Sequence, residues 1–232
     1  MKKQDLYNGK AIVQGTSEWH RQRLGKFSAS RIGDLISKKA ELTKTALAYV
    51  NDITAERLLA EHITGDDGEF DNYVERNQKQ GFALQWGKYY EETARTKFAE
   101  LMGWKIEQVG TYTHDEHPFF LVSPDGIVEE QNMLVEFKCP QKTHFVNYAI
   151  AMRQGKSLKE IEANYYWQVQ AQLSCTGAER CAFVVFNPDY KPFLAWVMVE
   201  RNDDDIRLML ERLTAAEALV KANVELLTGN QF

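Results

Sequence analysis

Two acidic residues and a lysine stand in the otherwise apolar stretch SPDGIVEEQNMLVEFKCP (123–140). If Met133–Lys138 forms a strand, Glu136 and Lys138 project from the same face, because side chains alternate along a strand with a period of two. Asp125 stands eleven residues before Glu136, at a Pro-Asp-Gly turn that would begin the neighbouring strand. A hairpin between the two strands would therefore bring Asp125 beside Glu136.

Two converging carboxylates with no cysteine or histidine ligand nearby suit a hard divalent cation, which prefers oxygen ligands. The pattern favours Mg²⁺, or Mn²⁺ in its place, over Zn²⁺. Such an ion polarises a phosphoryl oxygen and lowers the pKa of a bound water, and Lys138 could orient that water or stabilise the developing negative charge. A bare D…ExK pattern is more often a pair of surface carboxylates with a lysine partner. Here the proline before Asp125, the apolar strand around Glu136 and the hairpin spacing favour the metal site.

Glu91 lies in the segment QWGKYYEETARTKF, which is helical in pattern. Ala94 and Phe98 follow it at i+3 and i+7, so Glu91 shares their apolar face, whereas Glu92 points with Arg95. A carboxylate on a buried face needs a partner, because an unpaired charge there is costly. A metal ion or its water shell is one such partner, and the dipole of a helix N-terminus is the alternative.

In a later helix, four residues recur on one face, at i, i+4, i+7 and i+11: Ile161, Tyr165, Gln168 and Gln172. Glutamines on such a face must find hydrogen-bond partners. They could reach a site at the sheet or be bonded inside the fold, and the spacing alone leaves both alternatives open.

Charge is unevenly distributed along the chain. Residues 1–50 carry a net charge of +6, whereas the rest of the chain carries −11. A basic arm on an acidic body can serve a polyanion locally, although ordinary unevenness explains the charges equally well. The basic run HRQRLGKFSASR supplies four cations and two serines between them: Arg21, Arg23, Lys26, Arg31, Ser28 and Ser30. On sequence alone, such a run is usually a solvated face.

Several classes of protein are disfavoured by the composition. No apolar run approaches the roughly 18 residues of a membrane span, and no apolar block follows the N-terminal lysines, as a secretory signal would require. The three cysteines show no CxxC spacing, so we expect free thiols in a reducing cytosol and a cytoplasmic protein. Cys139 lacks a paired histidine and should be inert. We expect no zinc at HDEH (114–117), because three residues of extended chain do not return to one side.

The elements that must position these residues follow from the periodicity. Helices are expected at 46–62, 84–101, 158–175 and 203–227, and strands at 104–113, 119–123, 125–130 and 133–140. Two further strands are expected within 181–201, around an Asn-Pro-Asp turn. The polar segment 64–81 is expected to be a loop or insertion. This order predicts an α/β (α+β-like) fold with a central mixed β-sheet flanked by helices. The length fits one domain over 1–232, with a basic helical region (1–63), the insertion (64–81), a catalytic core (82–200) and a C-terminal helix (203–227).

The stretch SPDGIV…LVEFKCP resembles the signature of the PD-(D/E)xK nucleases. Three more blocks, WHRQRLGKFSASRIGDLI, ALQWGKYYEETAR and YYWQVQAQLSCTG, resemble those of the phage lambda exonuclease (YqaJ-type) family in the same order. The resemblance runs from about Trp19 to the C-terminal helix and implies a restriction-endonuclease-like core.

The resemblance also implies the roles of individual residues. Two metal ions per active site would be held by Asp125, Glu136, the Phe137 backbone carbonyl and, through water, Glu91. Lys138, Glu91, Gln168 and Tyr165 would be the catalytic residues. Arg23, Ser30, Ser123 and Gln168 would bind the 5′ phosphate of DNA.

By the same resemblance, the chain is expected to be a Mg²⁺-dependent 5′-to-3′ exonuclease on linear double-stranded DNA. It would release mononucleotides and leave 3′ single-stranded tails for annealing recombination, encoded by a phage or prophage and acting in a bacterial cell. A homotrimeric ring and a single-strand annealing partner are implied, and no membrane. A PD-(D/E)xK nuclease of other polarity, an endonuclease, and a non-cleaving DNA-end-binding scaffold are the alternatives.

Overall fold

The computed structural model describes residues 1–7, 10–37, 42–77 and 81–229. The N-terminal half contains β1 (Leu6–Tyr7), β2 (Lys10–Ala11), α1 (Ser17–Arg23), β3 (Phe27–Ser28), η1 (Ala29–Leu35), α2 (Lys44–Arg57), α3 (Glu61–Thr64), α4 (Asp67–Asn77) and α5 (Phe82–Met102). The rest contains β4 (Tyr112–Thr113), β5 (Phe120–Val122), β6 (Gly126–Val128), η2 (Glu129–Gln131), β7 (Met133–Lys138), α6 (Lys142–Arg153), α7 (Leu158–Ile161), α8 (Ala163–Thr176), β8 (Arg180–Phe186), β9 (Leu194–Glu200) and α9 (Asp203–Thr228).

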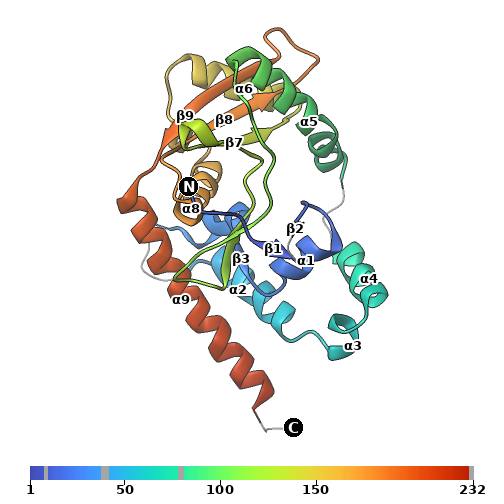
Figure 1. Ribbon diagram of the computed structural model, residues 1–232. Coiled ribbons are helices and arrows are strands. Elements are labelled where there is room, and N and C mark those ends of the chain that lie inside the picture. The colour runs from blue at the N-terminus through green and yellow to red at the C-terminus, as the bar shows by residue number, and fades with distance from the viewer. Residues whose placement is uncertain (8–9, 38–41, 78–80, 230–232) are drawn as a thin grey trace.

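The main sheet has four strands in the order β6-β7-β8-β9. β7 runs parallel to β8, and the other two pairs are antiparallel, so the sheet is mixed as the sequence predicts. A smaller sheet has the order β3-β5-β4. Figure 1 shows the main sheet at one end of the molecule and the long helix α9 running away from it along one side. The predicted class, α/β with a mixed sheet flanked by helices, is confirmed.

The alternation of side chains along β7 divides the core into two clusters. Met133, Val135 and Phe137 pack with Ala94 and Phe98 of α5 on one face of the sheet. Leu134 packs on the opposite face, in the cluster that also holds the apolar side chains of α8 and α9. Glu136 and Lys138 share the parity of Leu134, so strand geometry directs them toward the side of α8.

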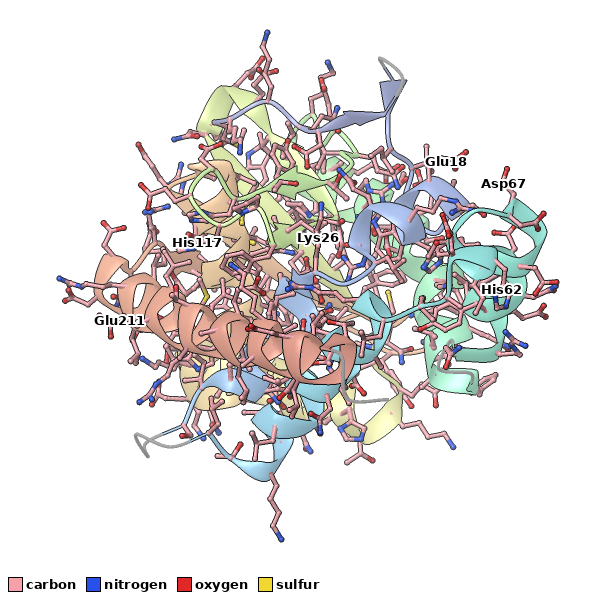
Figure 2. The ribbon with its side chains drawn as sticks, turned by 90° about the horizontal axis from the view of Figure 1, so that it is seen from below. Glu18, Lys26, His62, Asp67, His117 and Glu211 are labelled. Atoms are coloured by element: carbon pink, nitrogen blue, oxygen red, sulfur yellow. The ribbon has the colours of Figure 1, made fainter. Side chains whose placement is uncertain are left out.

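Two predicted helices have nearly the expected ends. α5 terminates at Gly103, whose φ of 65° is the left-handed conformation that glycine adopts readily. α9 begins after Asn202, whose side chain accepts a hydrogen bond from the Asp205 N–H, and three aspartates occupy its first turn. Figure 2 shows Glu211 of α9 at one edge of the molecule, with His62 and Asp67 at the opposite edge. No helix within the described residues is both long and apolar enough to cross a membrane.

Other predictions need correction. The segment 64–81 contains α4 where we expected a loop, because one apolar side chain, Phe70, is fully buried and anchors a mostly polar helix; residues 78–80 lie outside the described part. The helix expected at 158–175 is divided at Glu162, whose extended backbone separates the capped turn α7 from α8.

Two further differences concern the middle of the chain. The strand expected at 104–113 is reduced to β4 and one isolated bridge between Glu107 and Ile127. α6, which the sequence analysis does not predict, follows β7 directly and buries Phe145.

Candidate active site

The hairpin of β6 and β7 brings Asp125 beside Glu136. Gly126 is paired with Val135 in the antiparallel register, so the residue before Gly126 reaches the end of β7. The Phe137 N–H donates to Oδ2 of Asp125 over 2.8 Å. Asp125 is thus fixed to the strand that carries Glu136 and Lys138, as the sequence predicts.

Three nitrogen donors surround the carboxylate of Glu136, which is only 1% exposed. Lys138 Nζ and Gln168 Nε2 each donate to Oε1 over 2.6 Å, and Gln172 Nε2 donates to Oε2 over 2.7 Å. Both glutamines come from α8, which covers this face of the sheet. The glutamine face predicted from the spacing therefore meets the acid predicted from the strand.

Lys138 lies between the buried carboxylates and the surface. Burial opposes its charge, but attraction from Glu136 and Asp125 raises the pKa of Lys138 above its usual value, so the side chain stays protonated. Its Nζ lies 5.0 Å from the centroid of the Tyr165 ring, which is a cation–π arrangement. Tyr165 thus helps to hold the ammonium group in place.

Glu91 reaches the same region from α5. Arg95 donates to Glu91 over 3.0 Å and also contacts Glu92. Burial raises the pKa of Glu91; Arg95 opposes this, and repulsion from Glu136 adds to it. The predicted apolar neighbours Ala94 and Phe98 are fully buried, whereas the Glu91 side chain is 31% exposed, which leaves it within reach of a ligand.

A groove of about 1260 Å³ opens beside these residues. Its wall includes Glu91, Arg95, Phe137, Lys138, Tyr165 and, from α1, Trp19. Asp125 and Glu136 lie behind the wall formed by Phe137 and Lys138. Because Phe137 and Lys138 line the groove and are hydrogen-bonded to Asp125 and Glu136, a ligand in the groove would lie next to the acid cluster.

The oxygen ligands around Asp125 and Glu136 fit a hard divalent cation. Burial and repulsion from Glu136 raise the pKa of Asp125 well above its usual range although protonated Lys138 lies nearby, so a bound cation would favour the ionised form of Asp125. The available ligands are carboxylate oxygens and the Phe137 carbonyl, which suit Mg²⁺ or Mn²⁺. Within the described residues, no three carboxylate, imidazole or thiolate groups surround a single point. Binding would therefore need the backbone carbonyl and water to complete the ligand set.

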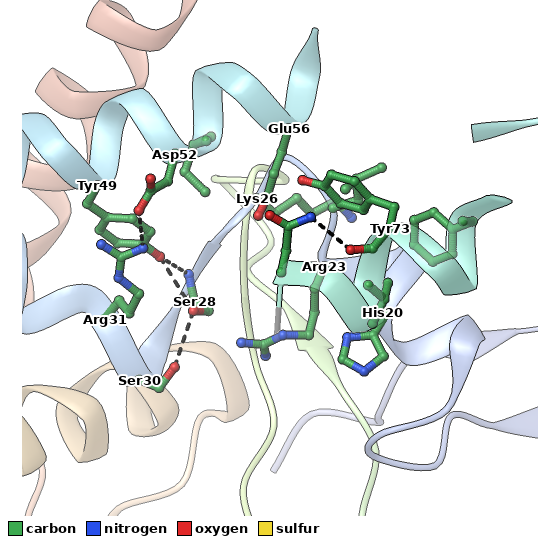
Figure 3. A pocket seen from close by; sticks show the side chains of 15 residues that line it. His20, Arg23, Lys26, Ser28, Ser30, Arg31, Tyr49, Asp52, Glu56 and Tyr73 are labelled. Atoms are coloured by element: carbon green, nitrogen blue, oxygen red, sulfur yellow. Dashed lines mark hydrogen bonds and ion pairs between the residues drawn. The ribbon is translucent and has the colours of Figure 1, made fainter. Parts of the chain in front are cut away.

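The predicted phosphate-binding residues are divided between two places. Arg23 and Ser30 line one cavity of about 240 Å³, together with Ser28 and Arg31 (Figure 3). Arg31 is paired with Asp34 and Asp52, whereas Arg23 has no ion pair with any described residue.

Ser123 and Gln168 lie outside the lining of that cavity. Trp19 donates from Nε1 to Oγ of Ser123 over 3.0 Å, and the Arg23 guanidinium stacks 4.2 Å from the centroid of a Trp19 ring. Trp19 therefore links Ser123 to Arg23, while Gln168 remains on Glu136.

Sequence reasoning missed Trp19 and Arg95 and assigned no role to Gln172. The i, i+4 spacing of Trp19 and Arg23 on a basic helix was the available signal for the stacked pair. For Gln172 the signal was its place on the same helical face as Gln168. The contact of Arg95 with both Glu91 and Glu92 follows from i+4 and i+3 spacing, but nothing in the pattern showed that Arg95 lines the groove.

Two features given no role from the sequence, the HDEH segment and Cys139, are described by the structure. The rings of His114 and His117 lie 4.9 Å apart, so the expectation that they diverge is wrong: the bend at Asp115 and Glu116 returns the chain to one side. Cys139 lines the groove, but burial raises the pKa of its thiol to about 12, which keeps it protonated near neutral pH.

The fold and the acid cluster define a nuclease-like core of the PD-(D/E)xK class: an aspartate at a hairpin, a Glu-x-Lys on the next strand, and helices on both faces. The chain belongs to the family of the YqaJ-like viral recombinase domain, whose model matches residues 18–179. A search of curated proteins gave no match.

Solved structures agree with this family. An alkaline exonuclease (LHK-Exo) from Laribacter hongkongensis is similar with a TM-score of 0.74 and 28% identity, over 91% of this chain and 96% of that one. The same enzyme in complex with dAMP gives the same values. A phage-related exonuclease from Haemophilus somnus 129PT shares the fold, with a TM-score of 0.66 and 14% identity over 88% of this chain and 96% of that one. Together the family and the LHK-Exo structure support a recombination-related exonuclease.

Replacing Asp125 with asparagine is expected to stabilise the metal-free protein at neutral pH. The raised pKa means that ionised Asp125 is less favourable in the folded than in the unfolded state above the unfolded pKa, and this penalty fades as the pH falls. Asparagine keeps an oxygen for the Phe137 N–H. A gain of about 1 kcal/mol would raise the Tm by about 2–4 °C in a chelating buffer at pH 7. Glu136→Gln is the matched control: it weakens the bonds from Lys138 and should lower the Tm, so a decrease in both variants would contradict the repulsion argument.

Proposed function

We propose that this chain is a metal-dependent exonuclease that digests linear duplex DNA from its 5′ ends. The observation that carries the proposal is the pair of buried acids, Asp125 and Glu136, next to Lys138 in the wall of an open groove, in a chain of the YqaJ-like family. An exonuclease structure that is 28% identical over most of its length supports the same reaction class. Release of mononucleotides and 3′ single-stranded tails completes the proposal.

The chemistry proposed is hydrolysis of a phosphodiester bond. Mg²⁺ ions, two in each site, would polarise the phosphoryl oxygen and supply an activated water. Asp125, Glu136 and the Phe137 carbonyl would hold them, with Glu91 acting through water. Lys138, kept protonated between Glu136 and the groove, would stabilise the negative charge that develops on the phosphate.

Gln168 and Gln172 act through Glu136 in this proposal. Their two bonds fix the carboxylate plane, so that Glu136 presents its oxygens in one orientation. Tyr165 limits the positions open to the Lys138 ammonium group. These side chains therefore organise the site before DNA arrives, which spares the reorganisation that would otherwise raise the barrier.

A comparison of linear and covalently closed circular duplexes of the same sequence tests this function. With Mg²⁺, the linear form should be consumed and the closed circle should persist; EDTA should stop digestion. Rapid cutting of the closed circle would indicate an endonuclease. Stable binding of linear DNA without cleavage would indicate an end-binding scaffold.

We also propose that the chain assembles as a homotrimeric ring and supplies its 3′ tails to a single-strand annealing protein. The charge distribution, +6 in residues 1–50 and −11 in the remainder, is compatible with basic surface gathered toward a channel. Light scattering at micromolar concentration should give about three times the 26.8 kDa mass of one chain. A strictly monomeric mass would reject the ring.

A further inference from the structure

The turn that follows α1 is held by two consecutive residues of α2. The Gly25 N–H donates to Oε2 of Glu56 over 2.7 Å, and Nε of Arg57 donates to the Gly25 carbonyl over 2.8 Å. Gly25 has a φ of +67°, and a Cβ there would lie 2.8 Å from Cγ of Arg57. Both polar backbone groups of Gly25 are therefore fixed relative to α2, and the close approach requires glycine.

Arg57 is itself oriented by the C-terminal helix. Its two terminal nitrogens donate to the two carboxylate oxygens of Glu217 in α9, over 2.9 and 2.7 Å. The Glu217 side chain is only 6% exposed, so the pair is largely shielded from water. A bidentate contact fixes the plane of the guanidinium group and hence the direction of the remaining Nε–H. Glu217 thereby determines where Arg57 meets the turn.

The turn held in this way carries Arg23. Arg23 is the last residue of α1, two positions before Gly25, and its carbonyl accepts a hydrogen bond from the Lys26 N–H over 3.0 Å. Glu56, the other residue that holds Gly25, lines the same cavity as Arg23 and Ser30. A guanidinium group binds a phosphate through two parallel N–H hydrogen bonds, so the strength of this contact depends on accurate placement of the group.

We propose that the Arg57–Glu217 pair is a positioning device for Arg23. α9 orients Arg57, Arg57 holds the Gly25 carbonyl, and the fixed turn sets the Arg23 guanidinium in the cavity with Ser30. Arg57 and Glu217 are positioning residues that act without touching DNA. The inference rests on the proposed recognition of a 5′ phosphate, and it makes the C-terminal helix a determinant of end preference.

A simpler role for the pair is to fasten α9 to α2. That role accounts for the two terminal nitrogens of Arg57 but not for its Nε–H, which is directed to the turn after α1. The two roles differ in their consequences. If the pair only joins α9 to α2, its loss should lower the Tm alone. If the pair positions Arg23, its loss should also change the preference for a phosphorylated end.

The test compares the wild type with Glu217→Gln and Arg57→Lys on duplexes with a 5′ phosphate or a 5′ hydroxyl. Glu217→Gln removes the charge that orients Arg57 with little change of shape. Arg57→Lys keeps the charge but cannot hold Glu217 in a bidentate contact and Gly25 at once. The ratio of initial rates, phosphate over hydroxyl, should fall about 3- to 10-fold in both variants. Anisotropy measurements in EDTA, where no cleavage occurs, should show a smaller difference in affinity between the 5′-phosphate and 5′-hydroxyl duplexes in both variants than in the wild type.

Leu213→Ala is the matched control for stability. Leu213 is a fully buried apolar residue of α9 and makes no polar contact with the turn. The assay temperature is set well below the lowest Tm of the series, and Leu213→Ala should leave the ratio unchanged. An unchanged ratio in both pair variants, with Tm values reduced as in Leu213→Ala, would overturn the positioning role.

Combination with Arg23→Ala separates this inference from the proposed function. If the pair acts through Arg23, Glu217→Gln should lower the ratio in the wild-type background and leave it unchanged in the Arg23→Ala background. A loss of preference in Arg23→Ala alone, with none in the pair variants, would reject the device and retain the phosphate site. If Arg23→Ala left the ratio unchanged, both would be overturned.

Discussion

Alanine at Asp125, Glu136 or Lys138 is expected to reduce DNA cleavage by about 10³-fold or more, because each change removes a group that we propose to act at the reacting phosphate. Asp125 and Glu136 are the buried acids proposed to hold the metal ions. Lys138 is the protonated group between them and the groove. Initial rates on a linear duplex at saturating Mg²⁺ measure the loss.

Glu129→Ala and Glu130→Ala are the matched controls for this prediction. Both glutamates lie at the turn between β6 and β7, at the end of the hairpin away from Asp125, and both are exposed, so each control removes one negative charge from the same hairpin without touching the site. Circular dichroism should show that all five variants keep the fold. Near wild-type cleavage in any one of the three site variants would contradict the proposed mechanism.

The second large effect is expected at the 5′ end of the DNA. Arg23→Ala should slow digestion of a 5′-phosphorylated duplex far more than that of a 5′-hydroxyl duplex. A charge-assisted contact of roughly 1.5–3 kcal/mol corresponds to a loss of about 10- to 150-fold. Arg23 has the geometry for such a contact: its guanidinium is stacked on Trp19, lines the cavity with Ser30, and has no ion pair with any described residue.

Arg23→Lys separates this contact from attraction at long range. Lysine keeps the charge but cannot form two parallel bonds to a phosphate. If Arg23 only attracts DNA, Arg23→Lys should behave as the wild type, and added salt should reproduce the effect of Arg23→Ala on both substrates. If Arg23 binds the terminal phosphate, Arg23→Lys should also reduce the preference for the 5′-phosphorylated over the 5′-hydroxyl duplex. An unchanged ratio between the two ends in both variants would defeat the assignment and leave the metal site intact.

The sequence predicts local geometry well where one periodic pattern determines it. The period of two in Met133–Lys138 placed Glu136 and Lys138 on one face, and the structure puts Gln168 and Gln172 opposite them. The position of Asp125 beside Glu136 was also predictable, because a short hairpin has few possible registers. These are contacts within one hairpin or along one helical face.

Features that depend on tertiary packing were harder to predict. α4 is polar except for a few residues, and Phe70 is its single fully buried side chain. The centroid of the Phe70 ring lies 4.1 Å from Cζ of Arg21 in α1. No local sequence pattern predicts such a buried side chain. The bidentate contact between Arg57 and Glu217 joins residues 160 positions apart. Its existence follows from the packing of α2 against α9, which neither helix specifies alone.

The most direct test of the account is the fate of each end of one linear duplex. Two preparations of the same 5′-phosphorylated duplex carry a label at the 5′ end or at the 3′ end of one strand, and each is incubated with the protein and Mg²⁺, with and without EDTA. We expect the 5′ label to appear at once in mononucleotides and the 3′ label to stay in long single strands. With EDTA, both labels should remain in the intact duplex. Early release of the 3′ label, or digestion that continues in EDTA, would contradict the account.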